Sequence, residues 1–251
     1  MKAECYSDLE LIRQIWDYED IRKLMYRRVL YGANEERHKE MNELWVSDPD
    51  YRKTACFGAN SGYYLGYEEV YKYYVKKREN ERLKQLAEIS KANPAIANVP
   101  KNLHVGCMSS RPLNTGMIEI AEDGATAKGL WFCIGHETTA QADGTATANY
   151  YTAKVGVDFV RETDGWKIWH LVIANDEGGE YGVTEMPHYG QRDISEEEFG
   201  EPTLKMVVHN KHFNWWDNFP YPPLPYKTFS DQVSYGPEGH PFRNGMRWEL
   251  R

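Results

Sequence analysis

Histidine and tyrosine side chains in this chain could carry out proton-transfer chemistry. An imidazole titrates near neutral pH, so His104, in the segment NLHVG, is suited to remove or return a proton. A phenol can donate to a carbonyl or assist a leaving hydroxyl, which makes Tyr31 a candidate acid. We predict that both are catalytic. The structural alternatives are a hydrogen-bonded histidine at a strand end and a core tyrosine with a satisfied hydroxyl.

Asn34 is the third candidate catalytic residue. Its amide could orient His104 or hold a substrate oxygen, but it cannot neutralise an imidazolium as a carboxylate would. The alternative is a helix cap, because Asn tolerates the left-handed conformation found at helix ends. Glu35 follows directly and could supply a carboxylate, although a glutamate at the start of a helix is more commonly exposed to solvent.

The substrate-binding residues are expected among aromatic and polar side chains. The chain has 18 Tyr and 8 Trp, and tyrosine joins a flat apolar face to a hydroxyl, which suits ring-shaped ligands. His136 shares strand parity with Ile134, and His170 shares it with Ile168, so both histidines are predicted to point inward; the alternative is a satisfied core histidine. The predicted set is Tyr26, Phe57, Trp131, His136, Asn149, Tyr151 and His170.

Charge and motif content argue against several other functions. The net charge of −8 and the absence of a basic block are unfavourable for nucleic-acid binding. The charged stretch around 76–84 mixes Lys and Arg with Glu and predicts a solvated helix face. His209 and His212 form HxxH without a nearby carboxylate, and the four cysteines form no CxxC pair, so we expect no metal and no cofactor.

The same features predict where the protein works. No apolar run approaches the ~20 residues needed to span a bilayer, the first residues lack the apolar stretch of a secretory signal, and separated cysteines fit a reducing cytoplasm. We therefore expect a cytoplasmic protein without a membrane partner.

Hydrophobic periodicity predicts helices first and an antiparallel meander second. Helices are expected over 8–31, 35–45 and 66–91, with strands over 51–57 and 63–65 between them. Period-two patterns then predict strands over 104–110, 115–121, 125–138, 146–162 and 166–175, with Asp-Gly pairs at 123–124, 143–144 and 164–165 as turns. This order implies an α+β fold with three N-terminal helices on one face of a curved antiparallel sheet.

The last third of the chain has a different amino-acid composition. Prolines and aromatic residues alternate in HFNWWDNFPYPPLPYKTF, so we predict neither sheet nor long helix there. So many aromatic residues also argue against free disorder. We predict a barrel domain over 1–176 and an extended arm over 177–251. The arm is expected to pack on the barrel or on a neighbouring subunit of a homo-oligomer, a dimer or trimer. There it either contributes to the subunit interface or closes the mouth of the pocket.

The order and spacing of several segments resemble the SnoaL-like, nuclear-transport-factor-like superfamily. IRKLMYRRVLYGANEERHKEMNELW is similar to its paired opening helices, and GYYLGYEEVYKYYV to the passage into its third helix. NLHVG, GMIEIAEDGATAKGLWFC and DFVRETDGWKIWHLV are similar to its meander. The resemblance implies a cystatin-like, cone-shaped barrel with an apolar pocket. It places His104 at the catalytic histidine of the dehydratase members, and it places Asn34 where those members carry Asp.

Together these features predict a cofactor-independent lyase that acts by proton transfer on a hydrophobic aromatic or polycyclic small molecule. A dehydratase and a carbon–carbon lyase that releases formaldehyde fit equally well. An isomerase would need only the proton transfer. The alternative from another class is a non-catalytic binder or carrier of a hydrophobic small molecule, which the Asn at position 34 favours.

Overall fold

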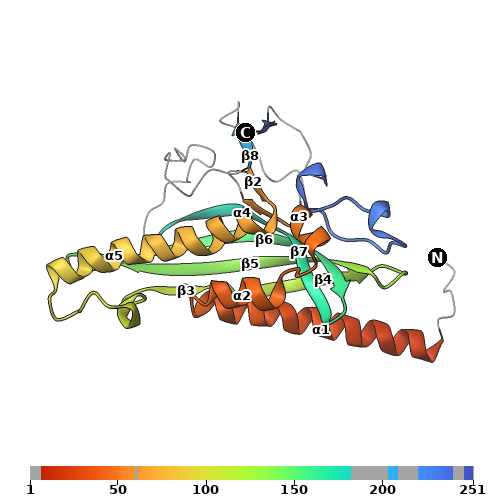
Figure 1. The fold of residues 1–251 in the computed structure, drawn as a ribbon, viewed down its shortest axis with the longest axis horizontal. Helices are drawn as coiled ribbons and strands as arrows, with labels where there is room; N and C mark the ends of the chain where they lie inside the picture. The colour runs from red at the N-terminus through yellow and green to blue at the C-terminus, as the bar shows by residue number, and fades with distance from the viewer. Residues whose placement is uncertain (1–6, 60–61, 182–202, 209–219, 240–245, 251) are drawn as a thin grey trace.

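The computed structural model describes residues 7–59, 62–181, 203–208, 220–239 and 246–250. Helices dominate the first part of the chain and strands the middle (Figure 1). The α+β fold predicted from the sequence is confirmed.

The first helix begins with a capping box, in which Ser7 Oγ accepts a hydrogen bond from the backbone N–H of Glu10. The helices before the meander are α1 (Asp8–Ala33), α2 (Arg37–Leu44), α3 (Pro49–Thr54), α4 (Tyr67–Tyr71), the π-helix η1 (Lys72–Lys77), α5 (Arg78–Ala92) and the 3-10 helix η2 (Pro100–Asn102). Since α4, η1 and α5 follow one another directly, they correspond to the single helix predicted over 66–91.

The strand predicted over 51–57 is wrong in its first half, where the chain forms α3. Asp48 caps this helix by accepting a 2.8 Å hydrogen bond from the N–H of Asp50. Pro49 occupies the first turn, where its missing N–H leaves no bond unmade. The pair Asp48-Pro49 therefore starts a helix, and the expectation of three N-terminal helices omitted α3.

The described residues form one sheet of nine strands. Its order is β3-β5-β6-β7-β1-β2-β8-β9, and β4 also pairs with β5. The strands are β1 (Cys56–Ala59), β2 (Gly62–Leu65), β3 (Met108–Ser110), β4 (Leu113–Ile120), β5 (Thr126–Ala140), β6 (Ala146–Glu162), β7 (Gly165–Glu180), β8 (Leu204–Val208) and β9 (Met246–Leu250). The meander is antiparallel, as predicted. However, β1 pairs in parallel with β7, so the sheet is mixed.

The helices cover one face of the sheet, here called the inner face. Trp131 and Cys133 of β5 and Val155 of β6 share a buried core with Ile21 and Met25 of α1. Figure 1 shows α1 and the α4–α5 stretch running along the length of β5 and β6. The inner face of the sheet therefore carries the main hydrophobic core. The polar residues of the candidate site, described below, lie on the same face.

Residues 220–239, here called the C-terminal arm, lie against the opposite, outer face. The backbone N–H of Glu122 donates to Tyr226 O at 3.0 Å, and Tyr235 is buried beside Val172 of β7. A Cβ on Gly156 would lie 2.7 Å from Cβ of Pro220, so a glycine in β6 permits the close approach of the arm. The arm contains two short 3-10 helices, η3 (Phe229–Asp231) and η4 (Pro237–Gly239).

The prediction that the last third of the chain contains no strand is wrong. β7 continues past residue 176 to Glu180, and β8 and β9 extend the sheet beyond β2. Neither β8 nor β9 contains a proline, so nothing prevents them from hydrogen bonding in a ladder.

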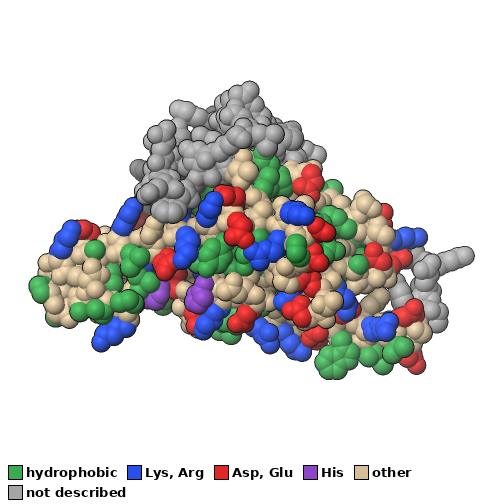
Figure 2. All heavy atoms as spheres, in the orientation of Figure 1, with side chains coloured by type: hydrophobic (Ala, Val, Ile, Leu, Met, Phe, Trp, Pro, Cys, Tyr) green, Lys and Arg blue, Asp and Glu red, His purple; other side chains and the backbone are tan. Residues whose placement is uncertain are grey.

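The surface in Figure 2 mixes acidic and basic side chains over the face in view. Hydrophobic side chains gather at the first half of α1, where Leu9, Ile12, Ile15 and Trp16 are exposed. Among the described residues, no helix has both the length and the apolar character to cross a membrane.

Candidate functional site

Two arginines at the start of α5 point to the inner face of the sheet. They follow the π-helix η1, and a π-turn changes which side chains of the following helix face a neighbouring element. The side chains of Arg78 and Arg82 are only 21% and 3% exposed. The prediction of a solvated face over this stretch is therefore wrong at these two residues.

Two carboxylates face these arginines. Arg82 Nη2 lies 3.0 Å from Glu35 Oε1 and 3.1 Å from Glu137 Oε1, and Arg78 pairs with the same two carboxylates. Glu137 lies on β5, and its other oxygen lies 3.3 Å from Arg111 Nη2. Glu35 adopts a φ of 56°, which is unusual for a residue with a side chain, and its carboxylate is buried. The expectation that Glu35 is exposed to solvent is therefore wrong.

The arginines keep both carboxylates ionised. Burial would raise the pKa of Glu35, but hydrogen bonds from Arg78 and the charges of Arg78 and Arg37 outweigh it and lower the pKa to about 2. The pKa of Glu137 is also lowered, because the charge of Arg78 outweighs the effect of burial. Neither carboxylate is therefore suited to carry a proton near neutral pH.

Arg37, at the start of α2, is buried but weakly paired. Its side chain is 9% exposed, and its closest carboxylate oxygen is Glu35 Oε2, 3.7 Å from Nε. The guanidinium lies 4.6 Å from the ring centroid of Tyr74. In the described part of the chain, Arg37 Nε has no hydrogen-bond partner.

Tyr151 of β6 completes this inner-face cluster, defined here as Glu35, Arg37, Arg78, Arg82, Arg111, Glu137 and Tyr151. Its hydroxyl is buried and finds no hydrogen-bond partner among the described residues. The guanidinium of Arg111 lies 5.0 Å from its ring centroid. Burial raises the pKa of Tyr151 to about 12, although the charges of Arg111 and Arg37 act in the opposite direction. The phenol is therefore a hydrogen-bond donor at neutral pH.

Three further predicted substrate-binding residues lie on the same side of the sheet. Asn149 is opposite Glu137 in the ladder, so the two side chains share a face. Trp131 is buried in the core against Phe159. Phe57 is also buried, with its ring centroid 5.2 Å from that of Tyr74.

Tyr74 connects the cluster to a second ion pair deeper in the core. Its hydroxyl donates to the carboxylate of Glu40, at 3.1 Å from each oxygen. Arg28 Nε lies 3.2 Å from Glu40 Oε1. The charges of Arg28 and Glu40 balance each other, and this pair is buried deeper in the core than the inner-face cluster.

His104 lies at the rim of the inner-face cluster, in the turn between η2 and β3. It precedes the strand that was predicted to begin there, since β3 starts at Met108. Partial burial lowers the pKa of His104, and the positive charges of Arg82 and Arg78 lower it further against the effect of Glu35. The residue is exposed, and its lowered pKa favours the neutral imidazole.

The other two predicted catalytic residues have local structural roles. Asn34 is exposed and caps α1, with its backbone N–H donating to Leu30 O at 3.0 Å. The hydrogen bond from Lys39 lowers the pKa of the neighbouring Glu36 carboxyl, and a hydrogen bond from the Asn34 side chain contributes to the same effect. The hydroxyl of Tyr31 donates to Glu43. Neither side chain makes a described contact with His104, so the predicted trio is not assembled.

Three predicted substrate-binding residues lie away from the inner face. Tyr26 is 49% exposed on α1, where Arg22 lies over its ring. His136 shares the outer face of β5 with Ile134, which is 64% exposed, because the inward positions are Gly135 and Glu137. The inward orientation predicted for His136 is therefore wrong.

A β-bulge explains why the orientation predicted for His170 is wrong. The register of β6 and β7 shifts between Asp158 and Phe159, so Asp158 faces His170 while Phe159 faces Ile168. One extra residue in β7 reverses the parity of the side chains that follow. Ile168 consequently faces the core, and His170 faces outward.

His170 belongs to an outer-face cluster, defined here as Lys128, Asp158, His170, Ser234 and Tyr235. Asp158 Oδ2 accepts from Tyr235 N at 2.8 Å and from Ser234 Oγ at 3.1 Å, and lies 2.9 Å from His170 Nδ1. Lys128 Nζ pairs with the other oxygen. Burial would raise the pKa of Asp158, but the hydrogen bond from His170 and the charge of Lys128 lower it. The C-terminal arm covers the whole cluster.

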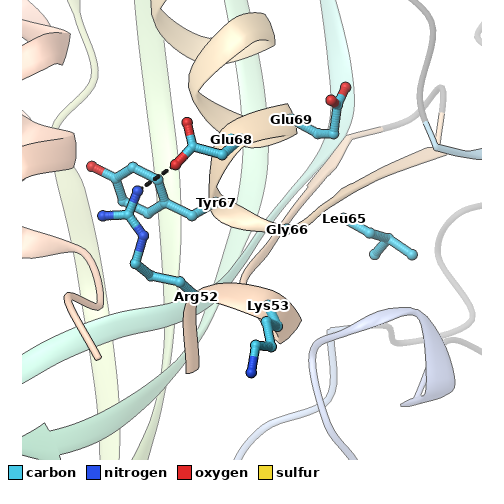
Figure 3. A pocket seen from close by; sticks show the side chains of 7 residues that line it. All are labelled: Arg52, Lys53, Leu65, Gly66, Tyr67, Glu68 and Glu69. Carbon is cyan, nitrogen blue, oxygen red and sulfur yellow. Dashed lines mark hydrogen bonds and ion pairs between the residues drawn. The ribbon is translucent and has the colours of Figure 1, made fainter. Parts of the chain in front are cut away.

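A shallow pocket of about 230 Å³ lies elsewhere, between α3, β2 and α4 (Figure 3). Arg52 lies over the ring of Tyr67, 3.7 Å from its centroid, and pairs with Glu68. The other two charged side chains that line it, Lys53 and Glu69, pair with Asp50 and Lys72 outside the pocket. The pocket contains none of the predicted site residues.

No group of three or more His, Cys, Asp or Glu side chains in the described residues could hold a metal ion. The HxxH pair, His209 and His212, lies outside those residues.

Sequence reasoning missed the arginines of the inner-face cluster. Arg78 and Arg82 are spaced i, i+4, which is a signal of a shared helix face, but alternating Glu residues hide it. Glu137 shares strand parity with Trp131 and Cys133, so its inward position could have been predicted. Nothing in the sequence indicates that Arg37 and Arg111 approach Tyr151, because they come from distant segments.

Comparisons with known proteins give matches among solved structures only. No protein-family model matches the chain, and no curated protein matches it either. An NTF2-like protein with a cystatin-like fold from Novosphingobium aromaticivorans is 16% identical, with a TM-score of 0.39 over 69% of this chain and 91% of that one.

Two other solved structures are similar to a comparable extent. A hexachlorocyclohexane dehydrochlorinase of Novosphingobium barchaimii is 12% identical (TM-score 0.44, 72% of this chain, 99% of that one). The beta subunit of a benzoate 1,2-dioxygenase from Burkholderia mallei is 16% identical (TM-score 0.43, 63% of this chain, 90% of that one). These neighbours include the family that the sequence resembles, but likeness at this level brings no residue role and no activity to this chain.

Proposed function

We propose that the protein is a cofactor-independent lyase that acts by proton transfer on an aromatic small molecule bound at the inner-face cluster. The observation that carries the proposal is the hydroxyl of Tyr151, which is buried and has no hydrogen-bond partner in the described part of the chain. An unsatisfied buried polar group costs about 1–3 kcal/mol. A ligand oxygen that accepts from this phenol would remove that cost.

Tyr151 and His104 would divide the acid and base roles. The raised pKa of Tyr151, about 12, keeps its proton available for a departing oxygen or a carbonyl. The lowered pKa of His104 keeps its imidazole free to accept a proton from the substrate. In an elimination, His104 would take the proton from carbon or oxygen, and Tyr151 would protonate the leaving oxygen. Loss of water fits this division when His104 takes the proton from carbon. Loss of formaldehyde fits it when His104 takes the proton of a primary hydroxyl, the carbon–carbon bond breaks to release formaldehyde, and the electron pair left behind forms a double bond as the neighbouring oxygen departs and is protonated by Tyr151.

The alternative is a carrier that binds a small molecule without chemistry. It is favoured by the absence of a described hydrogen bond between His104 and a carboxylate, and by the ion pairing of Glu35 and Glu137 with arginines. In a carrier, the cluster would only hold a ligand.

A screen of phenols, steroids and polyketides by mass spectrometry tests the proposal. Conversion of one compound, with turnover lowered about 10²–10⁴-fold in His104→Ala, is the expected result. The matched control is His38→Ala, since His38 is an exposed histidine on α2. Unchanged turnover in His104→Ala would remove His104 from the mechanism, and binding with no change in ligand mass would favour the carrier.

A further inference from the structure

The inner-face cluster contains more positive charge than the described carboxylates balance. Four guanidinium groups, those of Arg37, Arg78, Arg82 and Arg111, face the two carboxylates of Glu35 and Glu137. A further carboxylate, Glu81, lies 3.9 Å from Arg78 on the solvent side. Burying unpaired charge is costly, so an excess of this kind is typical of a site for an anion.

The excess lies at Arg37 and Arg111. Glu35 Oε1 and Glu137 Oε1 are already engaged by Arg78 and Arg82. Arg37 retains one ion pair at 3.7 Å and Arg111 one at 3.3 Å, and the Nε atom of each is buried without a hydrogen-bond partner in the described residues. Both side chains therefore have donors to offer.

The unused donors lie close to the unpaired phenol. Arg111 stacks over the ring of Tyr151, and Arg37 is near enough for its charge to act on the same hydroxyl. Trp131 and Cys133, on the same face of β5, belong to the buried apolar core beside them. Planar guanidinium groups bind carboxylates and other oxyanions through paired N–H donors.

We infer that the ligand of this site carries an anionic oxygen attached to an aromatic body, either a carboxylate or a phenolate, and that Arg37 and Arg111 hold this oxygen beside Tyr151. This inference rests on the proposed site and names the class of its ligand. It departs from the purely apolar pocket that the sequence resemblance implies, because the polar end of the inner face is lined by arginines.

Pairs of a charged probe and its neutral analogue distinguish a carboxylate ligand from a phenolate ligand. We expect NMR titration to show binding of 3-phenylpropanoate but not of 3-phenylpropanamide if the group is a carboxylate. If the group is a phenolate, 4-nitrophenolate at pH 8.5 binds and 4-nitroanisole does not. Arg37→Gln should weaken the binding anion roughly 10- to 100-fold, and Arg37→Lys less. Arg22→Gln, on the exposed side of α1, is the control and should bind as the wild type does.

Three results would overturn the inference: equal binding of an anion and its neutral partner, unchanged affinity in Arg37→Gln, or no binding of either anion. Arg111→Gln is a second variant in case Arg37→Gln does not fold, because Arg111 lies at the partly exposed rim. Different results would reject the anion site and the proposed lyase activity. Anion binding without any converted compound rejects the lyase alone, whereas turnover that Arg37→Gln and Arg111→Gln leave unchanged rejects the anion site alone.

Discussion

The two faces of the sheet carry polar clusters that differ in how many of their polar and charged groups have a hydrogen-bond or ion-pair partner. On the outer face, Asp158 accepts from Ser234, Tyr235 and Lys128, and Lys128 also lies 4.6 Å from the ring centroid of Tyr235. On the inner face, four arginines share two buried carboxylates, and the hydroxyl of Tyr151 is unpaired among the described residues.

We propose that this difference distinguishes a structural cluster on the outer face from a ligand-binding cluster on the inner face. In the outer-face cluster, Lys128 is paired with Asp158 and the C-terminal arm covers both, so its groups stabilise the docked arm. In the inner-face cluster, the hydroxyl of Tyr151 and the Nε atoms of Arg37 and Arg111 have no hydrogen-bond partner in the described part of the chain, and a ligand or water could satisfy them. Histidine alone is therefore a poor guide to the site, because His170 belongs to the structural cluster.

Removal of the C-terminal arm is the change with the largest expected effect on stability. A chain that ends at Gly182 loses Ser234 and Tyr235, which leaves Lys128, Asp158 and the apolar outer face exposed. We expect this chain to unfold or aggregate, as measured by circular dichroism and light scattering. A folded, monodisperse protein would show that the arm adds little stability.

Light scattering of the full chain tests a separate proposal, that the protein is a homo-oligomer whose arm contributes to the subunit interface. The measurement gives the mass of the protein in solution. A monomer would reject the proposal directly.

Replacing Asp158 tests the outer-face cluster without removing the arm. Asp158→Asn leaves Lys128 buried without its counter-charge, which typically costs about 3–5 kcal/mol. Urea denaturation measures the loss, and affinity for the anionic probe should not change in the folded protein. Asp20→Asn, at an exposed ion pair on α1, is the control and should have no measurable effect. A loss below about 1 kcal/mol would mean that Asp158 does not anchor the arm.

Replacing Glu35 should have a smaller and pH-dependent effect. The folded pKa of about 2 lies below the ordinary value of 4.5, so the stability contributed by ionised Glu35 is present above pH 4.5 and lost as the pH falls toward 2. Glu35→Gln should lower the free energy of unfolding by about 1–3 kcal/mol at pH 7. The difference from the wild type should close between pH 4.5 and 2.

The exposed Glu88, paired with Lys91, supplies the matched control for that titration. Glu88→Gln should follow the wild type at every pH. A constant difference between Glu35→Gln and the wild type from pH 7 to pH 3 would mean that the arginines do not depress the pKa of Glu35.

Local patterns were sufficient to predict most of the fold. The helices of the first hundred residues and the long strands β5, β6 and β7 follow their hydrophobic periods closely, and the Asp-Gly turns fall where predicted. The errors lie where a single residue changes the outcome. Pro49 starts a helix where a strand was predicted, and one bulge residue turns His170 to the other face.

The candidate site was only partly predictable, because it depends on contacts between distant segments. Tyr151 and Asn149, two of the predicted substrate-binding residues, lie on the inner face with the cluster. The arginines come from α2, α5 and the connection between β3 and β4, and no local pattern reports their convergence. Their charge changes the expected ligand from purely apolar to anionic.

Tyr151→Phe is the smallest change and tests the central claim most directly. Removing one hydroxyl from a binding cluster should leave the free energy of unfolding unchanged or raise it by up to about 1 kcal/mol, because no described partner loses a bond. The same variant should bind the anionic probe roughly 3- to 10-fold more weakly, since one hydrogen bond to the ligand is lost. A less stable protein with unchanged affinity would contradict the account and make Tyr151 a packing residue.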